Sequence, residues 1–278
     1  MKPLLLFALI LLALVTRAQQ KIVFDPEYAP QTRYITINYR FSDRKVTNDK
    51  GDTVRVDTVT HDPAHEITFV STLKTGRLPK TGKLPFSVHF TSTQTLKQDS
   101  IIYHTAEAKG KVGPYGQLSY ETASAVAWDK VTYKSPFMQQ FEDELGPRAS
   151  PVLNSMDTGS WYVDTIRTQF PFAGTYVAAT IVVTHTLTSI TDDTARFDND
   201  IDVIIDPKSP KLPVPVHGTG NGYGHTIYNW KEHYIQEDET YYTYELHVNF
   251  LAKVMHVTTS VYAKSDCIVT PADGDLDF

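Results

Sequence analysis

Residues 194–206 read TARFDNDIDVIID, and this stretch decides the fold. Apolar side chains hold one parity along it: Ala195, Phe197, Ile201, Val203 and Ile205. Charged side chains hold the other: Arg196, Asp198, Asp200 and Asp202. Because successive side chains of a β-strand point to opposite faces, the pattern predicts a strand with one apolar and one wet face. Strands of this kind are typical of antiparallel sheets that bury one face.

The same alternation extends outward over most of the chain. It recurs in residues 33–42, 174–190 and 242–250, and weaker strands are expected at 53–60, 66–73, 85–93, 101–106, 117–122, 160–170 and 254–263. The run at 174–190 is long for a strand and suits a strongly curved sheet or an open barrel. One short helix is expected at 136–145, where Gly146 and Pro147 would end it. We therefore predict an all-β fold, built as a curved antiparallel sheet or open barrel.

Residues 148–159 separate the chain into two halves, 19–150 and 160–278, with similar strand layouts. The stretch contains Pro151 and Gly159, which favour a connection over a regular element. Residues 89–96 in the first half loosely resemble residues 183–190 in the second. The halves are either a duplicated half-sheet within one domain or Thr-rich strands that are alike by chance.

The first 18 residues have the features of a cleavable secretion signal. Lys2 precedes an apolar run over residues 4–15, and a small-x-small site ends at Ala18. The run is shorter than the about 20 residues that a membrane-spanning helix needs. No cysteine follows the cleavage site, so anchoring as a bacterial lipoprotein is not expected. We expect a mature chain of residues 19–278, a single β domain that is exported, soluble and either periplasmic or extracellular.

The charge balance argues against nucleic acid as a partner. The whole chain carries a formal net charge of -6, and the signal takes two positive charges with it, Lys2 and Arg17, which leaves about -8. The sequence has no cluster of Lys and Arg typical of nucleic-acid binding, and no segment after the signal is apolar enough to span a bilayer. Its single cysteine, Cys267, excludes an internal disulfide, and the apolar neighbours Ile268 and Val269 favour a buried thiol.

Two short stretches carry a resemblance to a known group of proteins. They are the entry Gly159-Ser160-Trp161 and the strand end 187–192, LTSITD, in a chain that begins with a secretion signal. With these features the chain resembles a family of exported bacterial β-sheet proteins to which no activity is assigned. The general layout of that family is similar to lipoprotein-carrier proteins, in which a curved antiparallel half-barrel wraps around helices. The resemblance implies export and a curved sheet, and it assigns no functional residue.

The sequence contains few patterns typical of catalysis. It has no Gly-x-Ser-x-Gly motif, and no base is adjacent to Cys267. The most distinctive segment, residues 217–225, reads HGTGNGYGH. No Lys-Ser/Thr pair follows these glycines and no βαβ unit surrounds them, so the segment is neither a P-loop nor a dinucleotide loop. We interpret it as a long mobile connection between strands and, because such loops often contact ligands, as a candidate binding segment.

Three histidines spaced by eight residues, His217, His225 and His233, are the nearest approach to a metal site. Zinc binds neutral imidazoles, and three of them would leave one position open for water. On one extended strand, however, His225 and His233 would stand about 26 Å apart at roughly 3.3 Å per residue. We therefore predict no metal site and no cofactor. His185 lies on the apolar parity of its strand, and we interpret it as a neutral, hydrogen-bonded core residue.

Aromatic residues supply the remaining candidates for binding. Tyr223, Tyr228 and Trp230 begin a dense group of Tyr and Trp residues that extends to Tyr244. Such a group suits either a platform for sugars or peptides, or cross-strand packing in the core. We take as candidate ligand contacts His217, His225, Tyr223, Tyr228 and Trp230.

The function expected from these features is non-enzymatic binding, without catalytic residues. The partner would be a small apolar ligand, a glycan or another envelope protein. A binding module of this kind predicts a cavity above ~300 Å³ lined by apolar and aromatic side chains. The alternatives are a hydrolase with its site near residues 217–233 and a structural protein that pairs through exposed strand edges.

Overall fold

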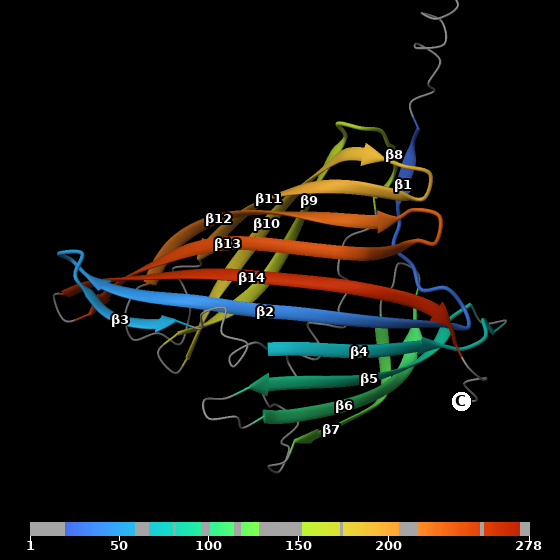
Figure 1. Ribbon diagram of the computed structural model, residues 1–278, viewed down its shortest axis with the longest axis horizontal. Helices are drawn as coiled ribbons and strands as arrows, with labels where there is room; N and C mark the ends of the chain where they lie inside the picture. Colours follow the sequence, from blue (N-terminus) through green and yellow to red (C-terminus); the bar gives the residue numbers. More distant parts are fainter. Residues whose placement is uncertain are drawn as a thin grey trace, which may run out of the picture.

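The computed structural model describes residues 20–58, 67–79, 82–95, 101–113, 118–127, 152–172, 175–205, 216–250 and 253–272 (Figure 1). Within these residues the chain consists of β-strands and their connections, and it contains no helix. The earlier strands are β1 (Ile22–Phe24), β2 (Thr32–Asn48), β3 (Thr53–Thr58), β4 (Ile67–Thr75), β5 (Leu84–Thr95), β6 (Ile101–Val112) and β7 (Leu118–Ala127). The later strands are β8 (Val152–Met156), β9 (Trp161–Phe172), β10 (Thr175–Ile190), β11 (Thr194–Ile205), β12 (Val216–Asn229), β13 (Tyr234–Phe250) and β14 (Lys253–Pro271).

Twelve of the strands form one antiparallel sheet. Eleven lie side by side in the order β7-β6-β5-β4-β2-β14-β13-β12-β11-β10-β9, and β3 pairs with one end of β2. In the described part of the chain β7 and β9 do not pair with each other, so the sheet is not closed. The predicted all-β class with a curved antiparallel sheet is confirmed. The helix expected at 136–145 and the secretion signal expected at 1–18 lie outside the described residues.

The two halves of the chain meet in the middle of this sheet. β2 pairs with β14 from Thr32 opposite Pro271 to Asn48 opposite Met255. On one side of this pair lie β4 to β7, and on the other lie β13 to β9. Between the halves, part of the expected connection 148–159 forms β8, which pairs with β1 in a separate two-stranded sheet.

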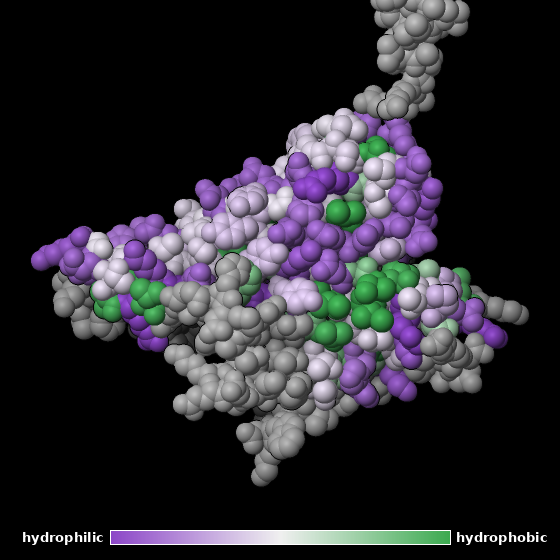
Figure 2. All heavy atoms as spheres, viewed as in Figure 1, coloured by the Kyte–Doolittle hydropathy of each residue, from purple (hydrophilic) through white to green (hydrophobic). Residues whose placement is uncertain are grey.

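The large sheet curls until its edge strand β9 faces the central strands. Residues of β9, β14 and β2 line one cavity, although four strands separate β9 from β14 in the sheet. Figure 1 shows β9 and β10 running across and behind β11–β14. We call the face toward this cavity the inner face and the opposite one the outer face. Figure 2 shows the outer face, where hydrophilic side chains gather over β11–β13.

β11 has the alternation that the sequence predicts, with buried and exposed side chains in strict succession after its first residue. In its pairing with β10, Ile201 lies opposite Val183 and Phe197 lies opposite Leu187. All four are buried, and burial of such a side chain contributes about 1.5–3 kcal/mol. A slip by one residue would move every one of them to the outer face, so the alternation fixes the register.

The glycine-rich segment 217–225 is a strand, and our expectation of a mobile connection is wrong. The segment lies within β12 and pairs with β11 on one side and β13 on the other. A Cβ atom at Gly220 or Gly222 would lie 2.4 or 2.2 Å from a backbone oxygen of β13. Both glycines lie opposite inner-face tyrosines of β13, Tyr244 and Tyr242 respectively. Glycine therefore permits a close approach of the two strands, and the tyrosines supply the apolar surface that glycine lacks.

Buried side chains form three clusters. The first belongs to β9–β14 and includes Phe170, Val177, Ile201, Tyr242 and Tyr244. The second belongs mainly to β2 and β4–β6 and includes Tyr34, Phe69, Phe86 and Phe90. The third holds the β1–β8 pair on the large sheet and includes Phe24, Tyr162, Phe197 and Tyr228. The Phe24 ring lies 5.2 Å from those of Tyr162 and Phe197 and 4.8 Å from that of Tyr228, which fixes the β1–β8 pair against the large sheet.

Cys267 of β14 packs against the second cluster and is half-buried, so the predicted burial of its thiol is only partly met. The Thr36 hydroxyl lies 3.8 Å from its Sγ atom. The described part of the chain includes no helix with the length and apolar character required to cross a membrane.

Candidate ligand-binding cavity on the inner face

The inner face holds a cavity of about 350 Å³ between β9 and the central strands. Aromatic and aliphatic side chains form much of its wall: Phe24, Phe69, Tyr162, Phe170, Ile181, Val183, Tyr242 and Val261. Its volume lies toward the lower end of the roughly 300–1,000 Å³ typical of small-molecule sites. The curl of the sheet makes this space, because it brings edge strand β9 opposite β14 and β2.

Four polar side chains cross the wall of the cavity as a chain of hydrogen bonds, one from each of β10, β11, β12 and β13. His185 Nδ1 lies 2.7 Å from Asn199 Oδ1. Asn199 Nδ2 donates to Thr226 Oγ1 at 2.9 Å, and Thr226 Oγ1 donates to Asp238 Oδ1 at 2.7 Å. Asn199 and Thr226 are buried, and each of them forms two of these bonds. Buried polar side chains need hydrogen-bond partners, and these two residues have them.

The direction of this chain fixes the proton on His185. Asp238 accepts a hydrogen bond from the Thr226 hydroxyl, so the Thr226 oxygen accepts one from the Asn199 amide, and the Asn199 carbonyl accepts one from His185 Nδ1–H. The Nε2 atom of His185 is then the nitrogen with the free lone pair. Burial lowers the pKa of His185 below its ordinary value of 6.5, against the opposing effect of the Asn199 bond. His185 is therefore neutral near pH 7, and it can accept a hydrogen bond from a ligand.

Tyr162 of β9 covers the His185 ring. The two rings stack at 4.5 Å between centroids with 11° between their planes. Burial also raises the pKa of Tyr162, so its hydroxyl remains protonated. The side chain is 8% exposed, and its buried oxygen has no hydrogen-bond partner among the residues that the structure describes. A buried hydroxyl without a partner costs about 1–3 kcal/mol, which a ligand with a suitable polar group would recover.

The five residues that we selected from the sequence do not come together. Tyr228 is fully buried in the third cluster, where its hydroxyl donates to Asp25 Oδ1 at 2.9 Å. Trp230 lies in the turn between β12 and β13, and its indole N–H donates to the Thr191 carbonyl at 3.2 Å. Tyr228 and Trp230 therefore have structural roles in this fold.

His217, Tyr223 and His225 share the outer face of β12. Tyr223 is 67% exposed and lies 5.6 Å from the ring of Tyr241 on β13. Tyr223 and His225 also line an outer hollow of about 410 Å³ together with Arg196, Asp198, Glu239 and Tyr241. Because His217 lies eight residues away along the same strand, about 26 Å at 3.3 Å per residue, it belongs to a different part of the face.

The three histidines of the hydrolase alternative have separate partners. His225 Nε2 lies 2.8 Å from Glu237 Oε1, and His233 Nδ1 lies 2.8 Å from Asp25 Oδ1. His217 stacks on His247 at 5.5 Å. The general acid and base of a hydrolase must reach the same substrate atom or a common water, and these three histidines do not converge on one.

The sequence identified one member of the cavity and missed the others. His185 is hydrogen-bonded and its pKa is lowered by burial, as we expected, but it is half-buried in the wall of the cavity instead of lying in the core. Asn199 lay on the apolar parity of the stretch 194–206, between Phe197 and Ile201, and this anomaly was the available signal. Thr226 and Asp238 carry no such signal, because only the pairing of β12 with β13 brings them opposite each other.

Comparison of the chain with models of known protein families finds no match, and comparison with curated proteins finds no significant relative. The chemistry of the cavity itself therefore carries the functional argument.

Proposed function

We propose that the mature chain is an exported, non-enzymatic binding protein whose inner cavity holds a small, largely apolar ligand with one polar group. The observation that carries the proposal is the cavity of about 350 Å³, in whose partly aromatic wall lies Tyr162, a residue with a buried hydroxyl that has no described partner. His185, whose ring stacks on that of Tyr162, supplies an acceptor through the lone pair of its Nε2 atom. The pair would recognise a hydroxyl or amine, while the aromatic wall binds the apolar remainder.

Apolar surface predominates in the wall, although Arg40, Asp164 and Lys264 also line it, and this favours an apolar ligand over a sugar. Sugars need several hydrogen-bonding groups at defined positions, and here Asn199, Thr226 and Asp238 already bond to one another. Phe24, Phe69 and Phe170 contribute only apolar surface. Export rests on the signal at residues 1–18. A curved sheet around a cavity also agrees with the proposed similarity to lipoprotein-carrier proteins.

A neutral fluorescent probe, N-phenyl-1-naphthylamine, tests the proposal, because it is apolar and carries a single N–H donor. Its fluorescence should rise on binding to the purified mature chain. Thr168→Trp should abolish the increase, because Thr168 lies on the inner face of β9 and lines the cavity. The matched control is Arg167→Trp, since the neighbouring Arg167 side chain is exposed and points to the outer face.

Three outcomes would contradict binding of the probe in the inner cavity. The probe would fail to bind the wild-type chain, or it would bind the Thr168→Trp variant as tightly as the wild type. Alternatively, Arg167→Trp would abolish binding, which would place the probe on the outer face. Circular dichroism of each variant shows whether the sheet is intact.

A further inference from the structure

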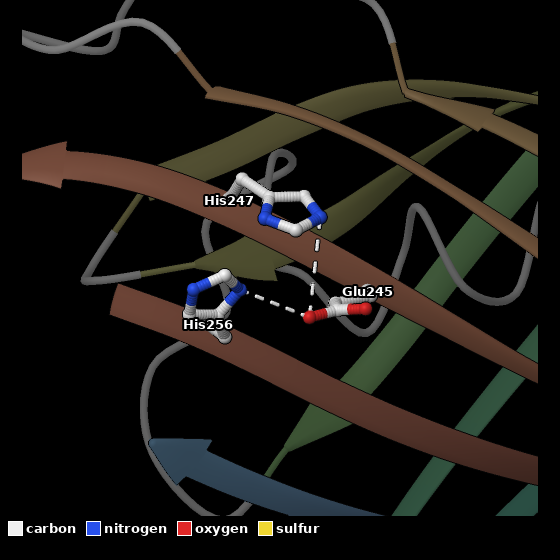
Figure 3. A group of neighbouring side chains, drawn as sticks. All are labelled: Glu245, His247 and His256. Carbon is white, nitrogen blue, oxygen red and sulfur yellow. Dashed lines mark hydrogen bonds and ion pairs between the residues drawn. The ribbon is translucent and has the colours of Figure 1, made fainter. Parts of the chain in front are cut away.

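A second group of polar side chains lies on the outer face, near the end of β13 and the start of β14. It consists of Glu245 and His247 from β13 and His256 from β14 (Figure 3). His247 and His256 lie directly opposite each other in the register of the two strands. Cross-strand neighbours on one face stand close together, so the pairing itself brings the two imidazoles to one place.

The geometry gathers three potential ligand atoms around one point. Glu245 Oε1 lies 3.0 Å from His256 Nδ1 and 3.9 Å from His247 Nε2. All three ligand atoms lie within 4.8 Å of one another. Figure 3 shows the three side chains turned toward one another on the same side of the ribbon. Ligand atoms about 2.0–2.2 Å from a zinc ion are about 3.3 Å apart in a tetrahedron, so only small side-chain rotations would complete the site.

The exposure of these side chains permits such rotations. The side chains of Glu245, His247 and His256 are 45%, 35% and 30% exposed. They are open to ions from solvent, yet their strands hold them together. His217 extends the row, because it lies opposite His247 on β12 and its ring stacks on that of His247. This stacking supports the orientation of the His247 ring.

A second group of potential metal ligands in the same molecule allows the two groups to be compared. His225, Glu237 and Glu239 also bring three potential ligand atoms together on the outer face. That group offers one imidazole instead of two, and Lys264 Nζ already lies 3.7 Å from Glu237 Oε2. Zinc and its neighbours in the transition series prefer imidazole nitrogen, whereas magnesium and calcium prefer oxygen ligands. The group with two imidazoles is therefore the better site for a transition metal.

We propose that Glu245, His247 and His256 bind one Zn²⁺ ion or a similar divalent transition-metal ion. Two nitrogens and one carboxylate oxygen supply three ligands, and water takes the remaining position. The ion would join β13 to β14 close to the pair formed by Phe250 and Lys253. It would lie on the opposite face from the proposed ligand cavity and would act independently of it.

Isothermal titration of the untagged mature chain with ZnCl₂ tests this site. We expect one Zn²⁺ per chain, and at least tenfold weaker binding in each of His247→Ala and His256→Ala. Glu245→Gln keeps the shape of the side chain but removes its charge, and it should also weaken binding. MgCl₂ and CaCl₂ should give no binding at the same concentrations.

Two control variants make the result specific. His89→Ala removes an exposed histidine that also pairs with a glutamate, Glu107 at 3.2 Å, but that has no second imidazole in its group among the described side chains. His225→Ala disrupts the competing group. Both should bind Zn²⁺ as the wild type does. The proposal is overturned if the wild type binds no Zn²⁺, if His225→Ala removes the binding, or if His256→Ala leaves it unchanged in a protein whose thermal unfolding is intact.

Discussion

Replacement of Tyr162 by Phe tests whether the Tyr162 hydroxyl serves ligand binding or stabilises the fold. The change removes only the oxygen, and the ring keeps its contacts with His185 at 4.5 Å and with Phe24 at 5.2 Å. Because the hydroxyl is buried and lacks a described partner, its desolvation costs the free protein about 1–3 kcal/mol. After allowance for the small void left behind, we expect Tyr162→Phe to stabilise the free protein by about 1 kcal/mol, or roughly 2–4 °C in Tm.

The same substitution should weaken binding of 1-naphthol, measured by its displacement of N-phenyl-1-naphthylamine, because the naphthol hydroxyl can accept a hydrogen bond from Tyr162 and donate one to His185 Nε2. Loss of one hydrogen bond is worth about 0.5–1.5 kcal/mol, which is roughly a 2- to 12-fold increase in Kd. A variant that is more stable and yet binds less tightly would be difficult to explain by damage to the fold. Urea unfolding gives the stability change, provided that the slope of the free energy against urea stays constant.

Tyr228→Phe is the matched control in the same aromatic cluster. Its hydroxyl donates to Asp25 Oδ1 at 2.9 Å and is part of a satisfied network. Removal of that bond to a charged acceptor should destabilise the protein by about 1.5–3 kcal/mol. If Tyr162→Phe destabilises the protein as much as Tyr228→Phe does, the Tyr162 hydroxyl has a structural partner, and the reasoning about a ligand is refuted.

Two other predictions come from the structure and a third from the sequence. Gly222→Ala should destabilise the protein by about 1–3 kcal/mol in urea unfolding, because its Cβ would lie 2.2 Å from the Tyr241 carbonyl oxygen. The control is Asn221→Ala at the exposed neighbouring position, which should change the stability by less than about 0.5 kcal/mol. Since burial lowers the pKa of His185 in the folded state, the unfolded chain binds more protons below pH 6.5. The free energy of unfolding of the wild type should therefore fall relative to that of His185→Gln as the pH falls from 6.5. A difference in unfolding free energy that stays constant from pH 7.5 to 5 would contradict this. Mass spectrometry of the protein released from a bacterial envelope should find Gln19 as the first residue, and a chain that still begins at Met1 would contradict export by cleavage.

The fold could be predicted from alternation alone where each strand keeps an apolar and a polar face. In β11 the apolar side chains marked the inner face before any pairing was known. The β12 segment misled us because glycine carries no side chain and gives no hydropathy signal. Its alternate glycines do share one parity, but the tyrosines that compensate for them, Tyr242 and Tyr244, belong to the next strand.

The cavity could be predicted only in part. His185 and Asn199 are polar residues on otherwise apolar parities, and a search for such exceptions would have selected both. Their meeting depends on the register between β10 and β11, which places them directly opposite each other. Tyr162 is an ordinary aromatic residue in sequence, and its importance arises only because the sheet curls and buries its hydroxyl.

The group of Glu245, His247 and His256 could not be predicted from the sequence either. His247 and His256 are nine residues apart in the chain, a spacing that suggests no shared ligand on a single strand. The antiparallel pairing of β13 with β14 brings them opposite each other. Sequence spacing predicts contacts within a strand, whereas a site across strands requires the register.

The most direct test of the central claim is an NMR measurement of contacts between N-phenyl-1-naphthylamine and methyl groups of the mature chain. If the inner cavity is the binding site, the probe should show intermolecular nuclear Overhauser effects to Val183 and Val261, which line it. Effects confined to the exposed outer side chains of Val163 and Ile204, with none to Val183 or Val261, would contradict the claim.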